Sequence, residues 1–254
     1  MAITIKSERE IELMAEAGKI LERVHNELEK ALHPGMSTKD IDTLGEKIIR
    51  SYGCIPSFLN YNGYPASICV SVNQEVVHGI PDKHRIIQEG DIVSLDAGVI
   101  YKGYHSDAAR THAVGEVSEE AKKLIQVTKE SFFEGIKFAK AGNHLFDISG
   151  AIGRYAEERG YGVVRDLCGH GIGTALHEAP EIPNYEVGRK GVKLRPGMTL
   201  AIEPMINIGT HEVDWLDDDW TVVTRDGSLS AHYENTILIT EGEPRILSLT
   251  CDNE

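Results

Sequence analysis

Apolar residues recur at every third or fourth position near the start of the chain, and this spacing predicts two amphipathic helices. The apolar face of the first helix extends over residues 11–32, and Ser7 with Glu10 forms a capping-box pattern at its start. A His-Pro-Gly sequence ends this helix. Ser37 can cap the second helix, and Gly53 lies where its C-terminal cap is expected.

After these helices the apolar positions alternate with others, which predicts strands, first over residues 68–72. Residues 94–111 then form two β-runs joined by a turn at residues 101–103. If positions whose numbers sum to 203 pair, Asp96 faces Asp107 across this hairpin. Two facing carboxylates destabilise a hairpin unless a cation lies between them or one stays protonated. We therefore expect a bound cation here.

The same order of elements begins again after Gly115. Residues recur with an offset of 107: Gly35, Asp40, Ile41, Gly53 and Gly90 return as Gly142, Asp147, Ile148, Gly160 and Gly197. The segment from Gly90 to Asp96 therefore aligns with the segment from Gly197 to Glu203, and each segment ends in a carboxylate. His78-x-x-Pro81 is echoed by His177-x-x-Pro180. The repeat predicts a single domain, residues 1–254, with pseudo-symmetric halves of about 1–115 and 116–254 and a site between them. Chance similarity of short motifs is the alternative.

Composition narrows the classes of protein. The 254 residues are 41% hydrophobic, enough for a substantial core, and the net charge of −14 without a basic tail argues against DNA binding. No apolar run approaches about 18 residues, and no signal-peptide pattern is present, so we expect a cytoplasmic protein without a membrane span. The cysteines are too dispersed for a zinc ribbon or a disulfide scaffold. They are Cys54, Cys69, Cys168 and Cys251.

Further candidate ligands lie in the second half. His170 stands among three glycines, Glu203 ends an apolar run before a proline, and Glu234 falls within a predicted strand, residues 229–240. A solvated histidine and an exposed strand-end glutamate are the plainer interpretations of the first two. With Asp96 and Asp107 they make four carboxylates and one imidazole, which suits two divalent ions and hydrolysis better than one tetrahedral zinc.

The order of these motifs resembles that of type I methionine aminopeptidases over nearly the whole chain. The motifs are His78-Gly-Ile-Pro, Asp96, Asp107, Gly169-His-Gly-Ile-Gly, His177-Glu-x-Pro, Glu203-Pro and Glu234-Asn. The resemblance implies an α+β pita-bread fold, with helices outside two pseudo-symmetric antiparallel sheets. It also implies a metal-dependent aminopeptidase that removes the initiator methionine from nascent proteins and peptides, with a preference for a small second residue.

By this resemblance the metal ligands are Asp96, Asp107, His170, Glu203 and Glu234, which hold two ions of Mn, Fe, Co or Zn, with Asp107 and Glu234 as bridges. Glu203 would also act as the general base. His78 and His177 would hydrogen-bond the scissile carbonyl and the developing tetrahedral species.

The resemblance also implies a methionine pocket, lined by Phe58, Tyr61, Tyr64, Cys69 and Trp220. Core packing is the alternative for the aromatic cluster at residues 58–64. Phe58 and Leu176 depart from the family's usual residues, which bears on the width of the pocket. Asn73 and Ser230 correspond to a monovalent-cation loop in the family.

Two other classes of protein compete with this interpretation. A prolidase-like relative would carry an extra N-terminal domain, for which there is no room before Ser7. A non-catalytic homologue would have lost its ligands, and all five are present here. The expected partner is a peptide or nascent N-terminus, bound by a monomer. A basic loop predicts ribosome contact, with an ordinary solvated loop as the alternative. Its residues are Arg189, Lys190, Lys193 and Arg195.

Overall fold

The helices form where spacing and capping residues predict them. Within residues 3–249, which the computed structural model describes, they are α1 (Glu8–Ala31), α2 (Thr38–Ser51), α3 (Glu119–Ile136) and α4 (Leu145–Glu157), with a short 3-10 turn, η1 (Tyr61–Gly63). The N–H of Ser7 donates to the Glu10 carboxylate at 2.7 Å, which confirms the capping box. The N–H of Asp40 donates to Ser37 Oγ at 3.1 Å and fixes the start of α2.

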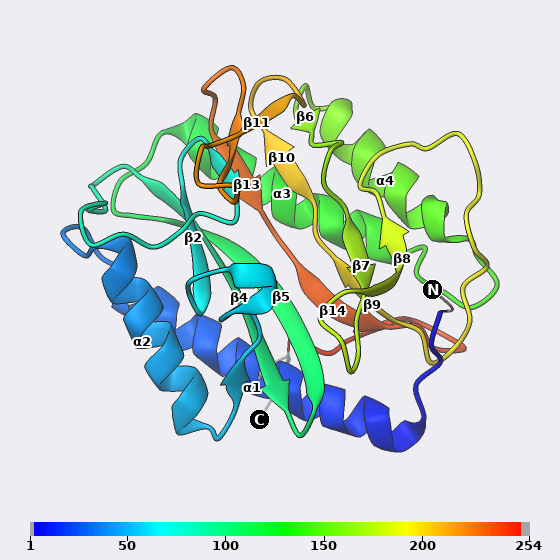
Figure 1. Ribbon diagram of the computed structural model, residues 1–254. Helices are drawn as coiled ribbons and strands as arrows, with labels where there is room; N and C mark the ends of the chain where they lie inside the picture. Colours follow the sequence, from blue (N-terminus) through cyan, green and yellow to red (C-terminus); the bar gives the residue numbers. More distant parts are fainter. Residues whose placement is uncertain (1–2, 250–254) are drawn as a thin grey trace.

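The strands pair antiparallel and form two larger sheets and two smaller ones (Figure 1). The first larger sheet contains β1 (Ile55–Pro56), β2 (Ile68–Val72), β4 (Ile92–Tyr101) and β5 (Tyr104–Ala113). The second contains β7 (Gly169–Gly171), β8 (Glu178–Ile182), β9 (Thr199–Ile202), β14 (Asn235–Leu238) and β15 (Arg245–Ile246). The smaller sheets are β6 (Gly162–Val163) with β10 (Met205–Asn207) and β13 (Ser230–His232), and β3 (Glu75–Val77) with β11 (Val213–Trp215) and β12 (Val222–Thr224).

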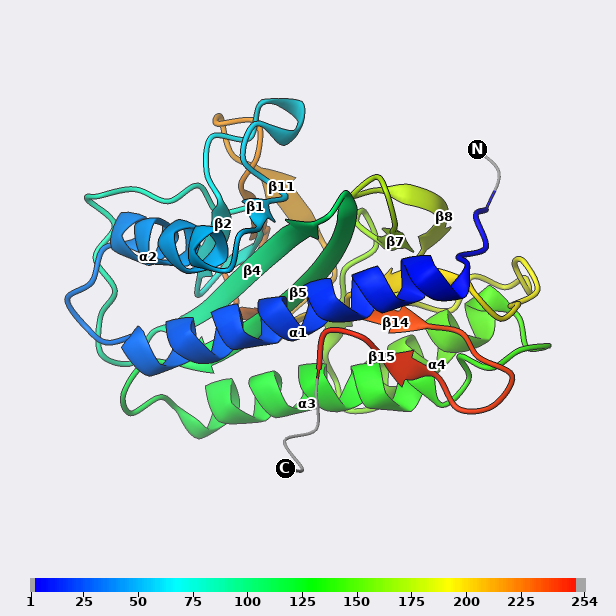
Figure 2. The same cartoon turned by 90° about the horizontal axis from the view of Figure 1, so that it is seen from below.

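The helices cover the outer faces of the sheets. Figure 2 shows α1 along the β4–β5 hairpin, with α3 and α4 on the other half of the molecule. Leu21 and Ile49 from the first helix pair are fully buried against Leu95 of β4. Phe132 and Ile148 from the second pair are buried in the same way against the second sheet. Each such side chain contributes about 1.5–3 kcal/mol on burial, so the helices hold the sheets in place.

The two halves share backbone details at the offset of 107 residues. The N–H of Gly35 donates to the Ile87 carbonyl at 2.8 Å, and the N–H of Gly142 donates to the Leu194 carbonyl at 3.1 Å. Both glycines have a left-handed backbone, with φ of 94° and 93°. A side chain at either position would be strained, which explains why glycine occurs at both. The pita-bread arrangement of pseudo-symmetric antiparallel sheets is therefore correct.

The predicted pairing within the hairpin was wrong by two residues. Lys102 and Gly103 alone form the turn, with φ of 49° and 87°, and residues whose numbers sum to 205 pair. Asp96 therefore faces Ala109, and Asp107 faces Gly98. Because the shift is even, the two aspartates still share one face of the hairpin as diagonal neighbours. The carboxylate of Asp96 remains close enough to that of Asp107 to help raise the pKa of Asp107.

The prediction that Glu234 lies inside a strand was also wrong. The strand stops at Tyr233 and Glu234, and its parts β13 and β14 belong to different sheets. The partner strand stops in the same way at Glu203 and Pro204, between β9 and β10. Paired residues on both sides of the break share one sum, 437, so Glu203 stands opposite Glu234. Asp96, in contrast, lies in the middle of β4 rather than at a strand end.

The second half joins the first along the outer edge of β5. The N–H of Asp107 donates to Thr236 Oγ1 at 2.9 Å, and the N–H of Glu234 donates to the Ala109 carbonyl at 3.0 Å. The N–H of His105 donates to the Gly173 carbonyl at 2.8 Å. These bonds form a seam between the halves, and both Asp107 and Glu234 lie on it.

The remaining structural expectations concern cysteines and membrane spans. Cys54, Cys69 and Cys168 are free thiols, and Cys251 lies outside the described residues. None of the helices within residues 3–249 is long and apolar enough to cross a membrane.

Candidate active site

All the residues that the sequence analysis assigned to metal binding, catalysis or the methionine pocket line one cavity of about 340 Å³. Those from the first half are Phe58, Tyr61, Tyr64, Cys69, His78, Asp96 and Asp107. Those from the second half are His170, His177, Glu203, Trp220 and Glu234. Asn62 and Leu176 complete the lining. The cavity is therefore built from both halves.

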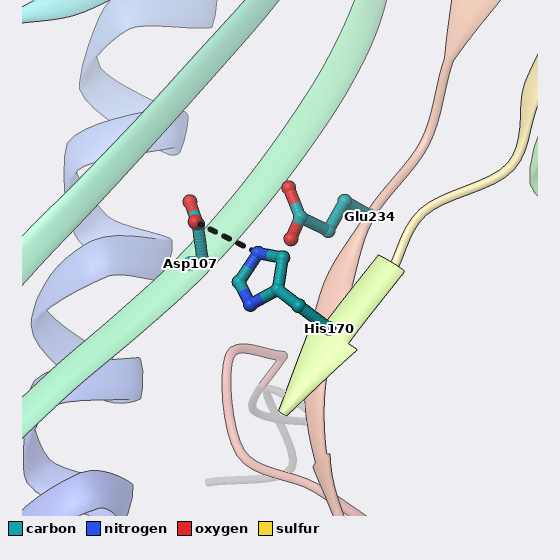
Figure 3. Close-up of side chains that lie close together, drawn as sticks. All are labelled: Asp107, His170 and Glu234. Carbon is teal, nitrogen blue, oxygen red and sulfur yellow. Dashed lines mark ion pairs between the residues drawn. The ribbon is translucent and has the colours of Figure 1, made fainter. Parts of the chain in front are cut away.

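Three ligand-type side chains from separate elements point toward one another in this cavity (Figure 3). They are Asp107 from β5, His170 from β7 and Glu234 from the break between β13 and β14. One atom from each of these side chains lies within 4.8 Å of the others, and all three residues are buried. Atoms that bind one cation at about 2.1 Å lie no more than about 4.2 Å apart, so a small adjustment lets one divalent ion contact all three.

The orientation of His170 supports a cation at this place. Its Nδ1–H donates to the Gly171 carbonyl at 2.9 Å, so Nε2 carries a lone pair. This Nε2 lies 3.9 Å from Asp107 Oδ2 and 3.7 Å from Glu203 Oε1. A lone pair facing two carboxylates is unfavourable without a positive charge between them. Burial also lowers the pKa of His170 to about 3, which keeps the ring neutral and able to bind a metal.

The carboxylates show the same requirement for a cation. Asp96 Oδ1, Asp107 Oδ1 and Glu234 Oε1 are buried and have no hydrogen-bond partner. Burial raises the pKa of Asp96 to about 7 and that of Glu203 to about 8. Burial, and then repulsion from the neighbouring carboxylates, raises the pKa of Asp107 and of Glu234 well above its ordinary value. Divalent cations would replace the protons that these groups otherwise retain, so the donor set fits such ions.

Two further histidines flank this cluster. The ring of His177 lies 4.1 Å from that of His170, centroid to centroid, and its Nδ1 is 2.7 Å from the Tyr61 hydroxyl. His177 is exposed, yet the groups around it remove enough water from its ring to lower its pKa. His78 has a left-handed backbone, with φ of 58°, and burial lowers its pKa to about 4. Both rings are therefore neutral at pH 7 and can donate one hydrogen bond each.

The aromatic cluster serves both as core and as cavity lining. Phe58, Tyr64 and Cys69 are at least 93% buried, with Phe58 the most exposed at 7%. The Tyr64 ring contacts that of Trp220 edge-on at 5.1 Å between centroids, and its hydroxyl donates to the Gly79 carbonyl at 2.9 Å. Because the polar end of Tyr64 is already paired, the cavity wall here is apolar.

Three residues near the site escaped sequence reasoning. His232 Nε2 lies 3.6 Å from Glu203 Oε2, and Asn184 Nδ2 donates to the backbone carbonyl of Glu203 at 3.1 Å. Thr236 holds the backbone of Asp107 at the seam. The only signal was the alternation that placed His232 and Thr236 on the same face as Glu234. Asn184 lies in an irregular segment where no pattern indicates a role.

A carboxylate-rich cluster at the seam of two pseudo-symmetric halves, with neutral histidines beside it, defines the protein as a metallopeptidase of pita-bread fold. The chain belongs to metallopeptidase family M24, whose family model matches residues 12–241. Membership of this family implies dependence on divalent metal ions.

Within this family, the chain is similar over nearly its whole length to several methionine aminopeptidases. The chain is 58% identical over 247 residues to a methionine aminopeptidase of Clostridium acetobutylicum, covering 97% of this chain and 99% of the relative. It is 51% identical over 239 residues to methionine aminopeptidase 1 of Bacillus subtilis, covering 94% and 96%. A crystal structure of methionine aminopeptidase from Thermotoga maritima matches with a TM-score of 0.96 and 47% identity, covering 98% of this chain and all of that one.

Prolidase-type enzymes share the fold but match less well. An Xaa-Pro dipeptidase from Bacillus anthracis has a TM-score of 0.78 and 27% identity, and the match covers 97% of this chain but 62% of that one. The comparisons therefore do not favour the prolidase-like alternative.

Proposed function

We propose that the protein is a metal-dependent aminopeptidase that removes the N-terminal methionine from peptides and nascent proteins and prefers a small second residue. The observation that carries this proposal is the single cavity in which the cluster of Asp107, His170 and Glu234 adjoins an apolar aromatic wall. A free α-amine can approach this cluster of ligand side chains while the thioether side chain of methionine packs against the aromatic wall.

We further propose that Asp96, Asp107, His170, Glu203 and Glu234 would together hold two divalent ions, to both of which Asp107 and Glu234 would contribute. The unpaired carboxylate oxygens and the free Nε2 of His170 support this assignment. Such ions would lower the pKa of a water molecule and polarise the scissile carbonyl as Lewis acids. Mn, Fe, Co and Zn all suit a set of four carboxylates and one imidazole.

In this proposal Glu203 takes a proton from the attacking water. A general base must be unprotonated when the water attacks, and divalent ions beside Glu203 would keep its carboxylate ionised although burial raises its pKa. His177 and His78 donate hydrogen bonds to the scissile carbonyl and to the charge that develops on it. If the Tyr61 hydroxyl donates to His177 Nδ1, the ring proton must lie on Nε2, where it can reach the substrate.

The methionine side chain would occupy the part of the cavity lined by Phe58, Tyr61, Tyr64, Cys69 and Trp220. Burial raises the pKa of the Cys69 thiol well above its ordinary value, so Cys69 contributes a neutral, polarizable wall. Leu176 packs in the same apolar cluster as Phe58, and these two residues set the width of the pocket.

A peptide panel tests the function directly. Metal-free protein and protein loaded with each divalent metal are assayed on Met-Ala-Ser, Leu-Ala-Ser, Met-Leu-Ser and Xaa-Pro dipeptides. Cleavage of Met-Ala-Ser alone, and only with metal, is expected. Preferential cleavage of Xaa-Pro would establish the prolidase-like alternative, and no cleavage with any metal would favour a non-catalytic homologue.

We also propose that Asn73 and Ser230 border a monovalent-cation site. The N–H of Ser230 donates to the Asn73 carbonyl at 2.9 Å, which holds the two segments together, and Asn73 has a left-handed backbone. A higher thermal unfolding temperature in K⁺ or Na⁺ than in a bulky organic cation at equal ionic strength is expected. Equal temperatures would remove the cation from this proposal.

We propose a cytoplasmic monomer consisting of one catalytic domain, residues 1–254, with halves of about 1–115 and 116–254. This organisation is supported by a cavity that residues of one chain complete. Sedimentation of the metal-loaded protein tests the monomer, and cell fractionation tests the location.

The basic loop before Pro196 remains a candidate for contact with ribosomal RNA. Its four basic residues, Arg189, Lys190, Lys193 and Arg195, are exposed between β8 and β9. Reversing these four charges should weaken co-sedimentation with ribosomes at low salt, because phosphate contacts depend on ionic strength. Unchanged co-sedimentation would leave the loop as ordinary solvated surface.

A further inference from the structure

His232 is a buried imidazole that none of the proposed roles uses. It ends β13, its residue is 1% exposed, and neither ring nitrogen has a hydrogen-bond partner. A buried N–H without a partner costs about 1–3 kcal/mol, and one nitrogen of any imidazole carries a proton. A hydrogen-bond acceptor for the N–H of this ring would therefore stabilise the folded protein.

The acceptor within reach is Glu203. His232 Nε2 lies 3.6 Å from Glu203 Oε2, while Glu203 Oε1 lies 3.7 Å from His170 Nε2. The Glu203 carboxylate thus lies between two imidazoles, of which only one can donate a hydrogen bond to it. The N–H of His170 already donates to the Gly171 carbonyl, so the nitrogen that faces Glu203 carries a lone pair. Neither nitrogen of His232 is hydrogen-bonded, so His232 can donate its N–H to Glu203.

The backbone of His232 is held firmly at this distance. Its N–H donates to Thr111 Oγ1 at 2.9 Å, and the same hydroxyl donates back to the His232 carbonyl at 2.9 Å. Thr111 lies on β5, so His232 is tied across the seam to the strand that carries Asp107. A ring fixed in this way can fix the carboxylate beside it.

We propose that His232 is a positioning residue that donates Nε2–H to Glu203 Oε2. This bond would leave Glu203 Oε1 directed at the cluster of Asp107, His170 and Glu234. Closing the gap from 3.6 Å to an ordinary length of about 2.9 Å requires a shift of about 0.7 Å. Hydrogen bonds of catalytic groups are often long before ligands bind and tighten afterwards. The inference rests on the proposed function insofar as Glu203 acts as ligand and base.

The test compares His232→Leu, which removes the donor, with His232→Gln, which retains an N–H. His25→Leu and His25→Gln are matched controls, because His25 is also buried and lines, with His232, a second cavity of about 310 Å³. His25 Nε2–H donates to the Ala108 carbonyl and makes no contact with Glu203 in the described structure. Each variant is titrated with Mn²⁺ alone by calorimetry, unfolded thermally without metal, and assayed on Met-Ala-Ser.

We expect His232→Leu to weaken Mn²⁺ binding and lower kcat by about 10-fold to 100-fold, with KM within about twofold of wild type. His232→Gln should restore both quantities to within about threefold, even where the two variants unfold at similar temperatures. The His25 variants should lower the unfolding temperature without changing Mn²⁺ affinity or kcat.

Two results would overturn the proposal. One is His232→Leu with wild-type Mn²⁺ affinity and kcat, and the other is His232→Gln as impaired as His232→Leu. Failure of the proposed function is distinguished from both, because it would show as wild-type protein that binds Mn²⁺ but does not cleave Met-Ala-Ser. The Mn²⁺ titrations would then still decide whether His232 orients Glu203.

Discussion

Replacing Thr236 with valine would remove one hydroxyl group from the seam and almost nothing else. Thr236 Oγ1 accepts the N–H of Asp107 at 2.9 Å and donates to the Asp107 carbonyl at 2.9 Å. Thr236 is fully buried, and Asp107 is 4% exposed. Valine has nearly the same shape, so the variant isolates the loss of these two hydrogen bonds.

The size of the effect follows from the groups left unpaired. A buried backbone donor or acceptor without a partner costs about 1–3 kcal/mol, so losing both bonds should cost about 2–6 kcal/mol. In a protein of this size each kcal/mol lowers the unfolding temperature by about 2–4 °C, which gives a fall of about 4–24 °C.

Thermal and urea unfolding of the metal-free protein measure this loss, with Thr128→Val as the control. Thr128 is equally buried, but its hydroxyl donates to the Leu124 carbonyl at 2.8 Å within α3. That carbonyl also receives a helical N–H, so this control should cost less than about 1 kcal/mol. Equal losses in the two variants would refute the idea that the Thr236 hydroxyl supports the seam.

Three further outcomes test the site. Glu203→Ala should abolish hydrolysis of Met-Ala-Ser and weaken metal binding, and full activity of metal-stripped wild type would contradict the mechanism. His177→Ala should lower kcat while the metal content of the purified protein stays near that of wild type; loss of metal would make His177 a ligand. Mn²⁺ binding should strengthen from about pH 6 to about pH 9, and binding at the lower pH should release protons. The reason is that the raised pKa values of Asp96, about 7, and of Glu203, about 8, leave both groups protonated at about pH 6 when no metal is bound. Calorimetry in buffers of different ionisation enthalpy counts the protons, and equal affinity at both pH values would be inconsistent with these shifts.

The helices and the composition of the site could be predicted because their signals are local. Ser37 with Asp40 marks a helix start by side-chain chemistry alone, and the structure has the corresponding bonds. The offset of 107 residues was visible because a left-handed backbone favours glycine, as at Gly35 and Gly142.

The hairpin register could not be read from the sequence for a physical reason. A two-residue turn of this kind needs a left-handed backbone at both central positions, and the structure has lysine at the first, Lys102. Lysine rarely adopts that conformation, so residues 101–103 suggested a turn centred elsewhere. In the observed register Asp107 and Ala109 hydrogen-bond to Thr236 and Glu234, which lie more than a hundred residues away in the sequence.

The breaks beside Glu203 and Glu234 are non-local in the same sense. Pro204 marks the break on one strand, but nothing in the sequence around Tyr233 marks the break on its partner. Alternation alone also cannot say which face of a strand meets a metal site, which is why His232 escaped notice. Only the closure of one half on the other makes these positions distinguishable.

The outer edge of β5 has a consequence for the behaviour of the protein in solution. A ten-residue strand at the side of a sheet would offer its unpaired backbone groups to another molecule, and such edges promote aggregation. Here Gly173, Glu234 and Thr236 occupy groups along that edge. Weakening the seam should therefore expose the unpaired edge of β5 as well as disturb the site. Seam variants should then aggregate on heating at temperatures where the wild-type protein remains in solution.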